Sequence, residues 1–113
     1  MKLTDFLTLR VRPAIGDTEA TQRWSDARLV AYCNDGVRQI SQMHPEAKYV
    51  STVTTDAPTD MTAGALNVDI PLTDYFLEPL WHFVVYHAMS EDSEDAANLE
   101  LSKHHLDEYR KLV

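Results

Sequence analysis

The sequence predicts an α+β fold that is mainly α: a four-helix bundle-like domain with a projecting β-hairpin. Four segments repeat apolar residues at helical spacing, and a segment between them is rich in β-branched residues and alternates apolar with polar positions. The chain has 113 residues, which suits a single hydrophobic core. We therefore expect one domain over residues 1–113.

The helices are expected at about residues 3–12, 25–43, 74–89 and 93–112. The second has the clearest boundaries. Ser25 can accept a hydrogen bond from a free backbone N–H in the first turn, and Pro45 pushes the residue before it out of the helical conformation. In the first helix, Pro13 is expected to end the apolar pattern.

The hairpin is expected at about residues 48–70. Its first arm, residues 48–55, contains β-branched residues and Tyr49, and its second arm alternates apolar and polar residues from Leu66 to Ile70. A lone two-stranded hairpin is weak, so this one must lean on the helices or on another subunit.

The core is expected where the apolar faces of the helices meet. Its predicted members are Trp24, Leu29, Cys33, Val37, Ile40, Leu77, Leu80, Trp81, Val84 and Val85. Further aromatic residues lie beside the stripe of the third helix and widen it beyond what a small bundle needs for its own core: Phe76, Phe83 and Tyr86.

Charge and composition exclude several classes of function. With 10 Lys and Arg against 18 Asp and Glu, the net charge is −8, which argues against general binding to nucleic-acid phosphates. The longest apolar-rich stretch, residues 76–89, is shorter than the about 20 residues that a membrane span needs. The N-terminal residues lack the pattern of a signal peptide, so we expect a soluble protein.

Catalysis and metal binding are not expected. Cys33 shares a helical face with Leu29 and Val37, which is typical of a small core residue rather than a nucleophile. His87 and Glu91 are four residues apart, as are His104 and Glu108, and such pairs can share a metal, but a third ligand would have to come from elsewhere. His104 and His105 fall on a polar face, which indicates solvent or an interface. The sequence therefore predicts no enzyme, no cofactor and no metal site.

Residues 23–46, RWSDARLVAYCNDGVRQISQMHPE, carry a resemblance. An Arg-Trp-Ser-Asp start followed by Asn-Asp-Gly-x-Arg-x-Ile resembles the small head-to-tail adaptor (connector) proteins of tailed bacteriophages. The order of elements is also similar to that family, as are residues 75–112, with an apolar helix, an acidic turn and Ala-Ala-Asn opening the last helix.

The resemblance implies a structural virion protein that forms a ring, generally a dodecamer, beneath the portal protein. Such a ring joins head to tail, extends the channel through which genomic DNA passes and offers a platform for a downstream tail or nozzle protein. It would be located at the head–tail junction of the virion, and in the host cytoplasm during assembly. The C-terminal segment would dock on the portal, which points to Leu101, Leu106, Tyr109, Leu112 and Val113.

Two other functions stay open at this point. A small acidic helical regulator would bind one protein partner as a monomer or dimer. A metal-dependent enzyme using His87, Glu91, His104 or Glu108 is the more remote alternative.

Overall fold

The computed structural model describes residues 1–15, 24–44, 61–91 and 96–113. In these residues the chain is mostly helical, with four helices and no β-strand. The predicted α+β class is therefore wrong for the described part of the chain, which is all helical apart from its connections.

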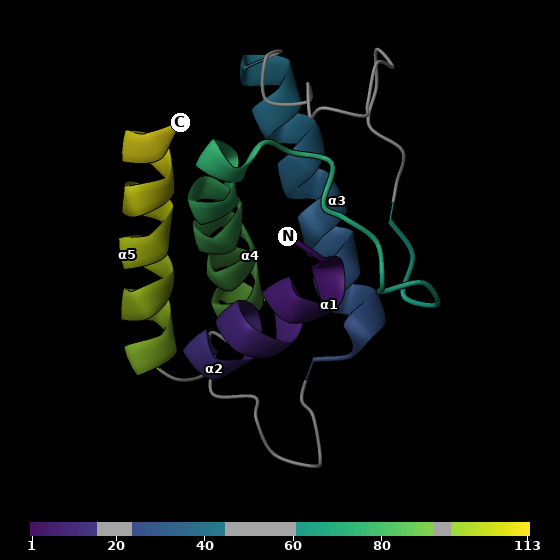
Figure 1. The fold of residues 1–113 in the computed structure, drawn as a ribbon. Coiled ribbons are helices and arrows are strands. Elements are labelled where there is room, and N and C mark those ends of the chain that lie inside the picture. The colour runs from purple at the N-terminus through teal and green to yellow at the C-terminus, as the bar shows by residue number, and fades with distance from the viewer. Residues whose placement is uncertain (16–23, 45–60, 92–95) are drawn as a thin grey trace.

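The first helix is built from three consecutive pieces, and the other three helices are regular. Its pieces are α1 (Leu3–Asp5), the π-helical η1 (Phe6–Val11) and α2 (Arg12–Ala14). The remaining elements are α3 (Asp26–Met43), the short 3-10 turn η3 (Asp74–Phe76), α4 (Leu77–Glu91) and α5 (Ala96–Leu112). In Figure 1, α4 lies between α5 and α3, antiparallel to α5, and the first helix crosses in front of their lower ends.

The expected second arm of the hairpin bonds to the N-terminus instead. The backbone N–H of Leu3 donates to the Val68 carbonyl (2.8 Å), and that of Thr4 donates to the Leu66 carbonyl (3.0 Å). The N–H of Ile70 donates to the Met1 carbonyl (3.0 Å). The segment that alternates apolar and polar residues is thus bonded to the N-terminal residues, and of its three apolar side chains Ile70 is buried, Leu66 is half-buried and Val68 is exposed. The expected first arm, residues 48–55, lies outside the described residues.

Pro13 does not end the first helix, which continues to Ala14. The π-helical turns of η1 change the hydrogen-bond register, so that the Arg12 N–H donates to the Leu7 carbonyl, five residues earlier. Pro13 then falls in the first turn of α2. The proline donates no backbone hydrogen bond, and it follows directly on the change of register at the end of η1.

The residues predicted for the core are buried, except Trp81, which is partly buried at the edge of the core. The indole N–H of Trp81 donates to the carbonyl of Arg10 (2.8 Å) and so ties α4 to η1. Phe76 and Phe83 are also buried, within this single chain. The wide apolar stripe of α4 is therefore largely covered by the chain's own helices, because α4 lies between α3 and α5.

Gly36 allows α3 and α4 to approach closely. A Cβ atom at this position would lie 2.6 Å from Cδ1 of Leu80 and 2.8 Å from Cδ1 of Phe83. Both distances are too short for carbon atoms in contact. The glycine in the middle of α3 is therefore a packing requirement of the helix pair.

Candidate functional site

The inward face of α5 is formed by Ser102, His105 and Tyr109, which are buried and spaced three and four residues apart. Tyr109 is one of the predicted docking residues, and in this chain it is buried against α3 and α4. Its hydroxyl donates to Oε1 of Gln39 (2.5 Å) and its ring packs against Phe83, with 5.3 Å between centroids. Burial raises the pKa of Tyr109 to about 12, so the phenol stays protonated at neutral pH.

The other four predicted docking residues lie on the outside or at the edges of α5. Leu101 is 45% exposed and Leu112 is 39% exposed, whereas Leu106 and Val113 are half-buried. Val113 packs against the core, and its carbonyl is bonded to the His44 ring (3.1 Å). Among the residues of α5 whose side chains the structure describes, from Glu100 onward, Leu101 and Leu112 are the exposed large apolar ones.

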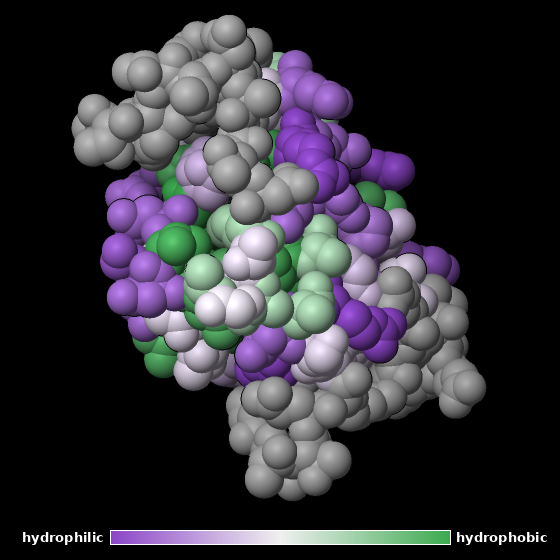
Figure 2. Space-filling model, turned by 90° about the vertical axis from the view of Figure 1, so that its right-hand side faces the viewer, coloured by the Kyte–Doolittle hydropathy of each residue, from purple (hydrophilic) through white to green (hydrophobic). Residues whose placement is uncertain are grey.

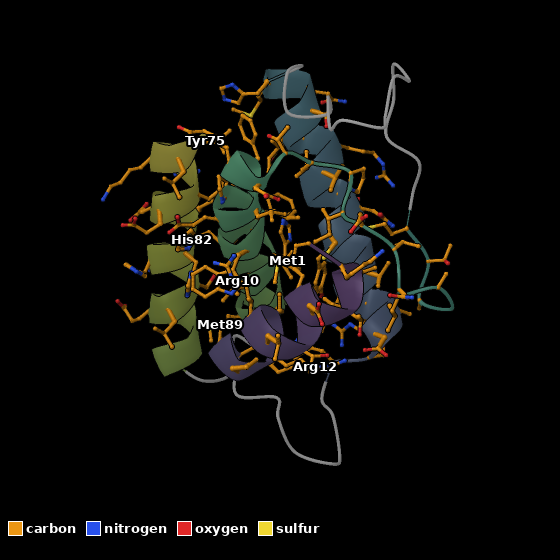
Figure 3. The ribbon with its side chains drawn as sticks, viewed as in Figure 1. Met1, Arg10, Arg12, Tyr75, His82 and Met89 are labelled. Carbon is orange, nitrogen blue, oxygen red and sulfur yellow. The ribbon has the colours of Figure 1, made fainter. Side chains whose placement is uncertain are left out.

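Leu112 lines a pocket at the junction of α5, η3 and the first helix. The pocket has a volume of about 410 Å³, and it is bounded by Arg10, Asp74, Tyr75, Leu77, Glu78, Pro79 and Leu112. Tyr75 is 79% exposed beside the pocket; Figure 3 shows it near the end of α5 that carries the C-terminus.

The pocket combines apolar walls with charges of both signs. Arg10 supplies the positive charge, and its guanidinium lies 5.7 Å from the centroid of the Trp81 ring. Asp74 and Glu78 supply two carboxylates. This arrangement can accept an apolar side chain that is flanked by a basic group on the same partner. We name the exposed pair Tyr75 and Leu112, with this pocket, the α5-end surface.

The histidines lie in three different environments. His82 and His105 are buried and their Nδ1 atoms are 2.8 Å apart, so His105 faces α4 of its own chain and not the solvent or the interface with a partner that was predicted. His104 is exposed, as predicted. His87 packs among aromatic rings, 5.7 Å from Tyr32. In the described part of the chain, no group of three or more His, Cys, Asp or Glu residues is arranged to hold a metal ion.

Cys33 is fully buried in the core. Burial raises the pKa of its thiol to about 12, and the thiolate is therefore absent at neutral pH. Since the thiolate is the nucleophilic form, this cysteine cannot act as an activated nucleophile in the folded chain.

The residues that carry the resemblance have structural roles. Ser25 accepts a hydrogen bond from the backbone N–H of Arg28 (3.2 Å) and caps α3. Asn34 holds the 61–72 segment, because its side chain donates to the Met61 carbonyl and accepts from the Met61 N–H, both at 2.9 Å. Gly36 permits the close packing of α4. The motif at residues 23–46 therefore specifies how α3 begins and what it packs against, whereas Tyr75 and Leu112 of the α5-end surface lie in the second segment that carries the resemblance, residues 75–112.

Comparisons with protein-family models, with curated proteins and with solved structures found no match to this chain. Among the described residues, none of the helices is long and apolar enough to cross a membrane.

Proposed function

We propose that this protein is the subunit of a head-to-tail adaptor ring of a tailed bacteriophage, and that it docks on the portal protein through the α5-end surface. The proposal rests on the resemblance of residues 23–46 and 75–112 to that family, since the comparisons add no relative. It assigns the chain a structural role with no catalytic residue, in the virion and, before assembly, in the host cytoplasm.

The observation that supports docking most directly is the exposure of Tyr75 and Leu112 beside a pocket. A large aromatic side chain that is 79% exposed next to an exposed leucine is typical of residues that a partner covers. Tyr75 lies just before α4 and Leu112 is the last residue of α5. The two side chains therefore come together only when α4 and α5 have packed against each other.

The charge of the chain supports the second part of the proposed role. A net charge of −8 disfavours lasting contacts with DNA phosphates, and a conduit must let DNA slide without holding it. In the proposed ring, genomic DNA passes through the channel without sequence-specific binding, and the opposite face of the ring receives a downstream tail or nozzle protein.

The face formed by α3 and the 61–72 segment offers a matched control surface. Figure 2 shows this side of the molecule, where hydrophobic and hydrophilic side chains are interspersed on the described part. Val68 is 37% exposed in this segment, close to the value of 39% for Leu112. A charge introduced at Val68 therefore disturbs an equally exposed apolar residue on another surface.

The test is the mass of the protein in solution, alone and after mixing with the candidate portal ring, measured by native mass spectrometry and light scattering. We expect a saturable complex with many copies of the chain on each portal ring. Y75D/L112D should abolish this complex while V68D retains it, with circular dichroism confirming the fold of both. If Y75D/L112D and V68D bound the portal equally well, docking through the α5-end surface would be refuted.

The same measurement separates the alternatives. Portal that binds no copies of the wild-type chain would refute the adaptor function itself. A chain that binds no portal and stays a monomer or dimer in solution would instead favour the acidic helical regulator.

A further inference from the structure

Two buried histidines face each other across the seam between α4 and α5. His82 is 6% exposed and His105 is 8% exposed, and their Nδ1 atoms lie 2.8 Å apart. At this distance one ring donates its Nδ1–H and the other accepts it, so a single proton lies between the two nitrogens. Figure 3 shows His82 between the two helices.

One aromatic ring and four charged or titratable side chains surround the pair. The Trp81 ring centroid lies 4.7 Å from that of His82 and 5.2 Å from that of His105. Glu78 of α4 approaches Nε2 of His82 at 4.0 Å. The other groups that act on the pair come from α5 and from η1: His104, Glu108 and Arg10.

The distance identifies a hydrogen bond rather than a vacant metal site. Two nitrogen ligands bound at about 2.0–2.1 Å to a tetrahedral metal lie roughly 3.3 Å from each other. The observed separation of 2.8 Å is instead that of a direct hydrogen bond. No third ligand completes a metal set within the described residues.

We propose that the His82–His105 pair is an acid-operated latch between α4 and α5. A singly protonated pair keeps its hydrogen bond, because an imidazolium donates to a neutral imidazole. When both rings are protonated, two N–H groups face each other and two positive charges meet in a buried site, so the bond is lost. Helix α5 then separates from α4. This latch does not depend on the proposed ring.

The direction of the pH dependence follows from burial. Burial lowers the pKa of both histidines below 6.5, that of His105 to about 4, and in His105 the charge of His82 acts in the same direction. Between about pH 6.5 and pH 4 the separated helix therefore binds more protons than the docked helix. The docked state is fully stable above this window and loses stability as the pH falls through it.

Hydrogen exchange of backbone amides, read by NMR between pH 7 and pH 4 and corrected for the intrinsic exchange rate, tests the latch. Separation of α5 takes up at most two protons, so its opening constant should rise by up to about a hundredfold per pH unit. Amides of α3 should remain protected at pH values where α5 has opened. His105→Asn keeps a donor and an acceptor near the Nδ1 position but cannot titrate, so we expect a rise of at most about tenfold per pH unit.

His104→Asn is the matched control, because it removes an exposed histidine one residue away and leaves both members of the pair able to titrate. It should keep the wild-type steepness of opening, and its midpoint should move to slightly higher pH, because a charge that lowers the pKa of both histidines is lost. Should His105→Asn fail to fold, His82→Asn makes the same test, and the ¹⁵N shifts of the wild-type rings at pH 7 should show one protonated and one free Nδ1. Opening of α5 and α3 in parallel, or an unchanged response in His105→Asn, would overturn the latch. Slower α5 exchange on adding Zn²⁺ at pH 7, absent in His105→Asn, would overturn it by identifying a metal site.

Discussion

Replacing Gly36 by alanine should destabilise the protein, although alanine is the better helix former. On an open helix surface this substitution would stabilise by about 1 kcal/mol. Here the added methyl group would lie 2.6 Å from Leu80 and 2.8 Å from Phe83, and both neighbours are buried. Overpacking of a core typically costs about 1–3 kcal/mol, and two short contacts point to the upper half of that range. We therefore expect a net loss of about 1–2 kcal/mol.

Urea unfolding at pH 7, followed by circular dichroism, measures this change against the wild type. Ala31→Gly provides the reference, because Ala31 is exposed on the same helix and the variant measures the propensity difference between the two residues without a packing change. The free-energy cost of the clash is the difference between the change in unfolding free energy measured for Gly36→Ala and the gain that the Ala31 variant leads us to expect. If Gly36→Ala stabilised the protein as much as Ala31→Gly destabilised it, the packing argument for Gly36 would be refuted.

Three further predictions concern side chains that the structure buries or bonds. Cys33 should not react with a thiol reagent at pH 8 in the native protein and should react at once in urea, because burial raises its pKa to about 12; rapid native labelling would contradict this. Trp81→Phe should lower the free energy of unfolding by about 1 kcal/mol, because the Arg10 carbonyl loses its indole donor. Trp81→Ala also removes the packing of the ring and should lower it by about 3–5 kcal/mol. Equal urea midpoints for the two variants would contradict both estimates. Arg12→Met should destabilise the protein strongly, since the buried guanidinium donates hydrogen bonds to the Trp24 carbonyl and to the Asp26 carboxylate. Arg38→Met is the control: it removes an exposed ion pair with Asp35 and should change the urea midpoint little.

The helices could be predicted from the sequence because their signals are local. Ser25 caps α3 as expected, and the apolar periodicity of α3 and α4 picks out residues that the structure buries. The segment at residues 66–70 was predicted as half of a hairpin because alternation indicates extended backbone but does not show which segment supplies the hydrogen bonds. It did not show how deeply the apolar side chains are buried either, since Val68 is exposed and Ile70 is buried.

The inward face of α5 was missed for a different reason. Two of its three residues, Ser102 and His105, are polar, so a search for apolar positions passes over them. His105 is buried because His82 on another helix satisfies its Nδ1, and Tyr109 is buried because Gln39 accepts its hydroxyl. Both partners are distant in sequence, and single-sequence periodicity carries no information about them. The exposure of Tyr75 beside Leu112 depends on the same tertiary arrangement.

The bond between the Trp81 indole and the Arg10 carbonyl has a consequence for the order of synthesis. The two residues are 71 positions apart, and the contact between Tyr109 and Gln39 spans 70. The first helix leaves the ribosome long before α4, so the contact between Arg10 and Trp81 cannot form until most of the chain has been synthesised. We therefore expect nascent chains that stop before Trp81 to lack a docked first helix, and folding to be slower than in helical proteins whose contacts are local.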